Sequence, residues 1–321
     1  MVSKTTLLII GAVVCLILLF LFGFALNSEY AKTKELKVAL HQFRPDSPII
    51  TSCRNLTMEN ATYNLAKDIN ISSASCFHLC PFLEWARNEK PNLTGCSIDL
   101  DCACLVVQAD NITINGNGHS INGDLTNKTA GIYTNHSYTT IKDLSINAFD
   151  YNLFIDMAHG ASIKNNSIYG GGTYGAFFQY SNNSIFSNNT LTDNSYGMAV
   201  DYRSVNVSVE NNTIIGNHSR HNAMSGSTAI LDARFYNNTI SGYAYALRFE
   251  SVFTSVVSEN RLDADQYGIY VTHCGACGEN GSDTSMFNSF FNNTINAPVW
   301  LMDEGKNLYY PINIRGDCFR K

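Results

Sequence analysis

A short asparagine phrase recurs along the second half of this chain at near-fixed spacing. Two asparagines are followed by Ser or Thr and then by Ile or Leu, and four copies begin 23 to 26 residues apart. A fifth copy follows after a longer gap, so that the copies begin at Asn165, Asn188, Asn211, Asn237 and Asn292. A period of this length is typical of a solenoid, in which each repeat packs only on its neighbours.

The content of each repeat selects the type of solenoid. The units lack the several leucines of a leucine-rich repeat and the long apolar runs of helical repeats. Each unit instead has short β-prone runs separated by turn residues, such as 184–187, 190–192 and 196–202. Alternating residues of a strand face opposite sides, so stacked units of this kind predict a parallel β-helix with about 4.8 Å between coils.

The paired asparagines predict a corner of each coil. Asparagine tolerates the left-handed backbone conformation of a tight corner, and stacked asparagine side chains can hydrogen-bond along the stack. The Ile or Leu that follows is expected to fill the core. Gly175, Gly197 and Gly268 recur just before an apolar run, and we expect them at a second corner where a side chain would clash.

Two segments near the start of the body carry a family resemblance. They are residues 63–69, Tyr-Asn-Leu-Ala-Lys-Asp-Ile, and residues 104–121, from Cys104 to Ile121. They resemble the opening coils of right-handed parallel β-helix proteins of the pectin-lyase-like superfamily. The repeats are similar to those of archaeal and bacterial surface proteins and of the periplasmic copper-site maturation factor NosD.

The resemblance covers roughly residues 50 to 315 and implies an all-β fold. The expected fold is a right-handed, single-stranded parallel β-helix of about eight to nine coils, with an N-terminal transmembrane helix. The superfamily includes lyases, hydrolases, binding proteins and inert scaffolds, so the resemblance predicts the fold and leaves the activity open.

Five parts are expected along the chain. They are a transmembrane anchor at 1–27, a juxtamembrane helical stalk at 28–48, a disulfide-stapled N-terminal cap at 49–110 with an insertion at 76–95, the parallel β-helix at 111–310, and a C-terminal cap at 311–321. The run from Thr5 to Leu26 contains no charge and would span roughly 33 Å as a helix. Its exit sequence matches a cleavage site poorly, which favours an uncleaved anchor over a signal peptide.

Two signals disagree about the side of the membrane on which the body lies. The cations Lys32, Lys34, Lys37 and Arg44 follow the apolar run, and the positive-inside rule alone would keep the body inside the cell. Sixteen Asn-x-Ser/Thr sequons and nine cysteines outside the run indicate an oxidising compartment. Large domains translocate largely regardless of flanking charge, so we predict a single-pass membrane protein with its body outside the cytoplasm.

Nine sequons lie outside the repeat phrase and are the predicted glycosylation sites. Those at the asparagine pairs follow from the chemistry of the corners as well, and the one at Asn111 falls in an expected strand. The nine are Asn55, Asn60, Asn70, Asn92, Asn127, Asn135, Asn206, Asn217 and Asn280.

Six cysteines lie close together near the start of the body. The family resemblance implies that Cys53 pairs with Cys104. The other four would then form two more bridges, whose connectivity the sequence leaves open; they are Cys76, Cys80, Cys96 and Cys102. A zinc site at Cys76 and Cys80, with His78 nearby, is the alternative.

A second cysteine-containing excursion interrupts the last repeats. Cys274 and Cys277 lie in a glycine-rich stretch after an expected strand, which favours a stapled loop over a redox pair or a metal site with His273. We therefore predict no metal site and no cofactor in this chain.

The insertion near the N-terminus contains the most apolar, aromatic stretch outside the repeats. Phe82, Leu83 and Trp85 are the predicted docking residues for a partner. The alternative is a cap over the open end of the solenoid, which every solenoid needs.

Acidic and arginine side chains supply the candidates for catalysis. Counting twelve residues from the second Asn of a pair places Asp201 and Glu250 at the same point of their coils, with one coil between them. Arg203, Arg234 and Arg248 are expected nearby. Inverting glycosidases use carboxylates ~6.5–9.5 Å apart, yet charges on a solenoid usually form a solvated face, so these five are weak candidates.

Other function classes are disfavoured. The histidines are scattered, which argues against copper binding by analogy with NosD. Residues 45–321 carry 16 Lys and Arg against 25 Asp and Glu, a net charge of −9, which disfavours nucleic acid.

We predict a membrane-anchored extracytoplasmic glycoprotein that serves as a structural or binding subunit of a cell-surface assembly or membrane complex. Its expected partners are the membrane, other protein subunits and glycans. The alternative is a polysaccharide lyase or glycoside hydrolase.

Overall fold

The computed structural model describes the body of the chain with several gaps. The described residues are 48–71, 77–78, 100, 102–272, 285–303, 306–309 and 313–315. Their secondary structure is entirely β, so none of them belongs to a helix that could cross a membrane. The expected anchor at 1–27 and all but the last residue of the expected stalk at 28–48 lie outside these residues.

Each coil contains three successive strand positions, and every position stacks in parallel on the same position of the next coil. The first position forms one sheet, called sheet A here. Its strands are β1 (Ile49–Ile50), β3 (Thr62–Leu65), β7 (Thr113–Asn115), β10 (Thr140–Lys142), β13 (Ser162–Lys164), β16 (Ile185–Ser187), β19 (Ser208–Glu210), β22 (Arg234–Tyr236), β25 (Val256–Ser258), β27 (Met286–Phe291) and β30 (Lys306–Tyr309), with β21 (Ile230–Leu231) and β24 (Val252–Phe253) beside them.

The second and third positions belong to the other sheet, sheet B. The short second position is β4 (Ile69–Asn70), β8 (Ser120–Asn122), β11 (Ser145–Asn147), β14 (Ser167–Tyr169), β17 (Thr190–Thr192), β28 (Thr294–Asn296) and β31 (Asn313–Arg315). The third position is β2 (Arg54–Leu56), β6 (Cys102–Val107), β9 (Thr129–Thr134), β12 (Tyr151–Asp156), β15 (Tyr174–Gln179), β18 (Tyr196–Asp201) and β29 (Val299–Asp303). Both positions merge into one strand in β20 (Thr213–Gly226), β23 (Thr239–Glu250) and β26 (Arg261–Thr272).

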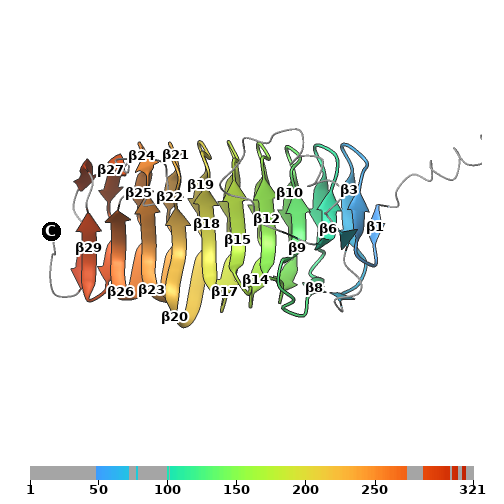
Figure 1. Ribbon diagram of the computed structural model, residues 1–321, viewed down its shortest axis with the longest axis horizontal. Helices are drawn as coiled ribbons and strands as arrows, with labels where there is room; N and C mark the ends of the chain where they lie inside the picture. Colours follow the sequence, from blue (N-terminus) through green and yellow to red (C-terminus); the bar gives the residue numbers. More distant parts are fainter. Residues whose placement is uncertain are drawn as a thin grey trace, which may run out of the picture. The chain divides into compact units, whose positions relative to one another are not determined.

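The coils follow one another along the body from β1 to β29 (Figure 1). About seven turns run without interruption from β7 to the end of β26, and β27, β28 and β29 continue the stack after a segment outside the described residues. The expected number of eight to nine coils was therefore slightly too high for the continuous stack. Among the described strands, only β5 (Phe77–His78) pairs antiparallel, on β6.

The core is a set of apolar columns that run along the stack. In sheet A, the central residue of each strand lies in register with the central residue of the next, and all are fully buried: Ile141, Ile163, Phe186, Val209, Phe235, Val257 and Phe290. The last residue of each asparagine phrase forms a second column, which includes Ile168, Leu191, Ile214, Ile240 and Ile295. The expected inward direction of these residues is confirmed.

The second asparagine of each pair forms a continuous buried ladder. The side-chain oxygen of Asn212 accepts from the backbone N–H and the side-chain amide of Asn189, at 2.9 and 3.2 Å. The amide of Asn212 in turn donates to Asn238 at 3.0 Å and to the Phe186 carbonyl at 2.9 Å. The same pattern links Asn166, Asn189, Asn212, Asn238, Asn260 and Asn293, all at most 3 % exposed. The predicted stacking of amides is confirmed.

The first asparagine of each pair supplies the backbone bend instead. In all five copies it has a φ between +50° and +57°, in the left-handed region that asparagine tolerates. The coil between Asn238 and Asn293 uses a variant of the phrase, in which Glu259 takes the bend at +59° and Asn260 keeps the ladder unbroken. The longer gap seen in the sequence therefore hides one degenerate copy.

The recurring glycines lie inside strands and not at a corner. Gly175, Gly197 and Gly268 are each the second residue of a long-strand segment that begins with tyrosine. A side chain at Gly197 would come within 2.3 Å of the Ala223 carbonyl in the next coil. The expected clash is confirmed, but its cause is the close approach of neighbouring coils within the sheet.

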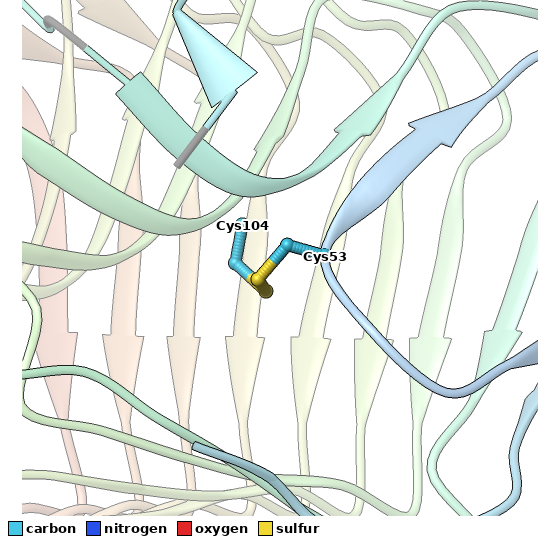
Figure 2. Close-up of a disulfide and its surroundings, with 2 residues drawn as sticks. All are labelled: Cys53 and Cys104. Atoms are coloured by element: carbon cyan, nitrogen blue, oxygen red, sulfur yellow. A yellow bond between two sulfur atoms is a disulfide. The ribbon is translucent and has the colours of Figure 1, made fainter. Parts of the chain in front are cut away.

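One predicted disulfide is present among the described residues. Cys53 is bonded to Cys104, which joins the entry segment to β6 across 51 residues (Figure 2). Cys102 is also disulfide-bonded. The remaining predicted disulfide cysteines, Cys76, Cys80, Cys96, Cys274 and Cys277, lie outside the described residues.

Most predicted glycosylation sites in the described residues are accessible. Asn60, Asn70, Asn127, Asn206 and Asn217 are exposed, whereas Asn55 and Asn135 are half-buried. Asn92 and Asn280 lie outside the described residues. Glycosylation remains a prediction at all nine.

We expect Asn212→Ala to lower the free energy of unfolding by about 2–5 kcal/mol, because it leaves the buried Asn189 N–H and the Phe186 carbonyl without partners. Asn211→Gly is the matched control, since glycine keeps the left-handed bend and should cost at most about 1 kcal/mol. Urea unfolding of both variants tests this, and equal stabilities would contradict a structural role for the ladder.

We expect the double variant Cys53→Ser/Cys104→Ser to lose about 4 kcal/mol of stability, because the bridge closes a loop of 51 residues. Thermal unfolding measures the loss. Mass spectrometry of unreduced peptides checks the pairing directly, and alkylation of Cys53 in the unreduced protein would contradict it.

Candidate functional site

The long strands of sheet B have an inner and an outer face. Leu153 and Ile155 of β12 point into the core, whereas Phe154 between them belongs to a separate apolar cluster on the other side. That cluster also contains Tyr133, Phe177 and Ala199, and Tyr151, Tyr174 and Tyr202 pack against it. We call this side of β6 to β29 the outer face; the strands that carry it lie side by side in Figure 1.

Tyrosines at the start of the long strands form a column across the outer face. Tyr151, Tyr174 and Tyr196 are in register, with ring centroids 5.7 and 4.9 Å apart and the rings stacked. In the next coil Asn222 takes the register position, and the ring of neighbouring His221 packs 4.3 Å from that of Tyr196. Further along, Tyr245 and Tyr267 stack at 5.1 Å. All five tyrosines are half-buried and so keep part of each ring accessible.

A second column, of carboxyl and amide groups, lies at the opposite end of the same strands. It contains Asp156, Gln179, Asp201 and Glu250, each five residues after a tyrosine of the first column. Register pairs Asp156 with Gln179 and Gln179 with Asp201. Glu250 lies two coils beyond Asp201, so Asp201 and Glu250 share a column with one coil between them.

Burial changes the acidity of two of these carboxyl groups. Asp156 accepts hydrogen bonds from Tyr133 Oη at 3.2 Å and Gln179 Nε2 at 2.9 Å, yet desolvation raises the pKa of its carboxyl group to about 6. Desolvation likewise raises the pKa of Asp201 to about 6, although Ser227 Oγ at 2.6 Å and the Tyr202 N–H at 2.8 Å donate to it. The pKa of Tyr174 is raised as well, first by burial and then by the charge of Asp201.

Arg248 is the cation of this face and it is already engaged. Its guanidinium group forms an ion pair with Glu250. The same group lies 5.9 Å from the ring centroids of both Tyr245 and Tyr270, a geometry for cation–π contacts.

The turn after the acidic column holds bulky residues in an unfavourable conformation. Met157, Tyr180 and Tyr202 directly follow Asp156, Gln179 and Asp201, and their φ angles are +48°, +48° and +49°. Bulky residues are rare in this region, but positive φ values recur at other corners of this chain, including Leu125, Tyr138 and Phe287, so the bend belongs to the geometry of the coils. The bend allows Tyr180 and Tyr202 to stack at 5.7 Å beside the carboxyl groups.

The structure separates the sequence-derived catalytic candidates. Asp201, Arg248 and Glu250 lie together on the outer face. Arg203 is exposed in the turn two residues after Asp201, at a φ of +55°. Arg234 starts β22 in sheet A, where its guanidinium lies 4.4 Å from the Tyr236 ring.

Sequence reasoning missed the tyrosine column, Asp156 and Gln179. A signal for them exists, because Tyr followed five residues later by Asp, Gln or Glu recurs at Tyr151, Tyr174, Tyr196 and Tyr245. The predicted docking residues Phe82, Leu83 and Trp85 lie outside the described residues.

Comparison with solved structures shows the fold. The mannuronan C-5 epimerase AlgE4 A-module of Azotobacter vinelandii matches with a TM-score of 0.52 at 12% identity, covering 82% of this chain and 83% of that one. The Dettilon tailspike protein gp208 matches with a TM-score of 0.50 at 11% identity, covering 81% of this chain and 60% of that one. No curated protein sequence matches this chain. Identities this low show similarity of fold alone.

A family model described as periplasmic copper-binding protein (NosD) matches residues 93–310, more than half of the chain. The described residues do not fit copper, because they contain no group of three or more His, Cys, Asp or Glu side chains placed to hold a metal ion. The pairs His119–Asp68, His136–Asp110 and His218–Asp265 are separate and largely exposed. The chain is a right-handed parallel β-helix of the pectin-lyase-like superfamily, and it belongs to the NosD family.

Proposed function

We propose that this chain is a membrane-anchored, extracytoplasmic binding subunit that holds an extended glycan on its outer face. The observation that carries the proposal is the pair of parallel columns on the long strands, tyrosines at one end and carboxyl or amide groups at the other. Both columns follow the coil spacing of about 4.8 Å, and Asn222 and Ser227 occupy their positions in the coil of β20. A linear polymer with its own short repeat is the ligand that such a surface suits.

The chemistry of the two columns matches that of a sugar chain. Tyrosine combines a flat apolar ring, which can pack on the apolar face of a sugar, with a polar hydroxyl group. Carboxylate and amide oxygens accept hydrogen bonds from sugar hydroxyls.

Sequence features and the family support the proposed location. The charge-free run from Thr5 to Leu26 is long enough to anchor the chain, and the accessible sequons suit a glycoprotein outside the cytoplasm. The description of the matching family model is also periplasmic. Other subunits of a cell-surface assembly are expected partners, and mass spectrometry of the native protein would identify both co-purifying subunits and occupied sequons.

A polysaccharide lyase or hydrolase is the second candidate. Asp201 and Glu250 would be roughly 10 Å apart across two coil spacings, close to the separation of inverting glycosidases. The raised pKa of Asp201, about 6, suits a general acid. We rank this candidate second because Glu250 is held by Arg248 and Asp201 accepts two internal hydrogen bonds on one oxygen.

We expect Tyr196→Ala and Tyr267→Ala each to weaken glycan binding about two- to tenfold, because each removes one ring from the face. Tyr236→Ala is the matched control, since Tyr236 lies on sheet A. A glycan array followed by affinity electrophoresis measures the effect. Equal losses in all three variants, or no glycan bound by the wild type, would contradict the proposal.

We expect the purified full-length chain to release no reducing ends from a polysaccharide that it binds. Asp201→Asn separates the two candidates, because Asn keeps the hydrogen bonds from Ser227 and Tyr202 but cannot act as an acid. If the wild type cleaves the polymer and this variant does not, the enzyme candidate replaces the binding subunit.

A further inference from the structure

The charges on the outer face are unevenly distributed. Three in-register columns cover the face from β12 to β26. The tyrosine column holds Tyr151, Tyr174, Tyr196, Asn222, Tyr245 and Tyr267. A middle column holds Phe154, Phe177, Ala199, Ser225, Arg248 and Tyr270. The column of carboxyl and amide groups holds Asp156, Gln179, Asp201, Ser227, Glu250 and Thr272. These positions carry three carboxyl groups and a single cation, Arg248.

Arg248 is shared between Glu250 and any anionic ligand that reaches this face. Its guanidinium group forms an ion pair with Glu250 and lies 5.9 Å from the ring centroids of Tyr245 and Tyr270, while part of the side chain stays exposed. Within these columns the carboxyl groups outnumber the guanidinium group by three to one, so an anionic ligand meets a net negative surface. Like charges brought together at a partly dehydrated surface repel strongly.

We infer that the outer face selects neutral glycans and rejects polyuronates, the linear sugar polymers with a carboxylate on each residue. This inference rests on the proposed function and names its ligand class. Neutral sugars offer the hydroxyl donors that Asp201 and Glu250 accept, without a charge that these groups would repel. The net charge of −9 over residues 45–321 acts in the same direction at longer range.

Two substitutions should reverse the selectivity between neutral and anionic glycans while keeping the shape of the side chains on the outer face. Asp201→Asn keeps the acceptor for Ser227 and Tyr202, and Glu250→Gln frees Arg248 while keeping the side-chain shape. The double variant removes two negative charges and exposes one positive charge. Glu210→Gln is the matched control, because Glu210 ends β19 on sheet A.

The test is affinity electrophoresis of the full chain in detergent at low ionic strength and at a pH well above 6. Glucomannan and mixed-linkage β-glucan serve as neutral probes, and polygalacturonate and alginate as anionic probes. We expect the wild type and Glu210→Gln to be retarded only by a neutral probe. The double variant should bind polygalacturonate at least about tenfold more tightly than the wild type does.

The possible results distinguish failure of the selectivity from failure of glycan binding. Binding of the wild type to a polyuronate overturns the selectivity but leaves glycan binding intact. A double variant that is folded by circular dichroism yet gains no polyuronate binding also overturns it. Failure of the wild type to bind any of the probes, or any glycan of an array, overturns the proposed function together with this inference.

Discussion

The buried asparagine column is the constraint on which the rest of this structure depends. Each second asparagine of the phrase is almost fully buried, and it is bonded to the asparagine of the neighbouring coil and to a backbone carbonyl one coil back. A buried amide without partners is costly, so a coil that slipped by one residue would lose several hydrogen bonds at once. Slippage would also turn the apolar columns toward solvent, because strand side chains alternate. The ladder and the core therefore enforce the same register.

The fixed register of the coils also aligns the side chains on the outer face. Tyr151, Tyr174 and Tyr196 occupy equivalent positions of successive coils, so the register alone brings their rings into stacking contact. The same alignment brings Asp156, Gln179 and Asp201 into one column and holds two of these carboxyl groups in surroundings that raise their pKa to about 6. The outer face therefore repeats with the coil, as the core does. A polymer with a short repeat of its own suits such a surface, and the net negative charge of the face favours neutral polymers over anionic ones.

The sequence predicts the repeating part of this fold well and the site only partly. The asparagine phrase was sufficient for the parallel β-helix, the amide ladder and the inward Ile and Leu, because each follows from local chemistry. Glu259-Asn260 escaped notice because only the second residue of the pair is needed for the ladder, while the bend accepts another residue. The Cys53–Cys104 pairing came from family resemblance and is present. The position of Arg234 on the other sheet could have been obtained from spacing, because Arg234 precedes Asn237 by three residues, as Ser208 precedes Asn211 in β19. The tyrosine and carboxyl columns required the register of the whole sheet before their side chains could be placed on one face.

A buried amide ladder fixes the register of the coils. Side-chain amide hydrogen exchange, measured by NMR on protein labelled at asparagine, tests it most directly. We expect the amide protons of Asn189, Asn212, Asn238 and Asn260 to exchange as slowly as the neighbouring backbone amides, while those of the exposed Asn188 and Asn211 exchange rapidly. Equally rapid exchange at both members of each pair would contradict it.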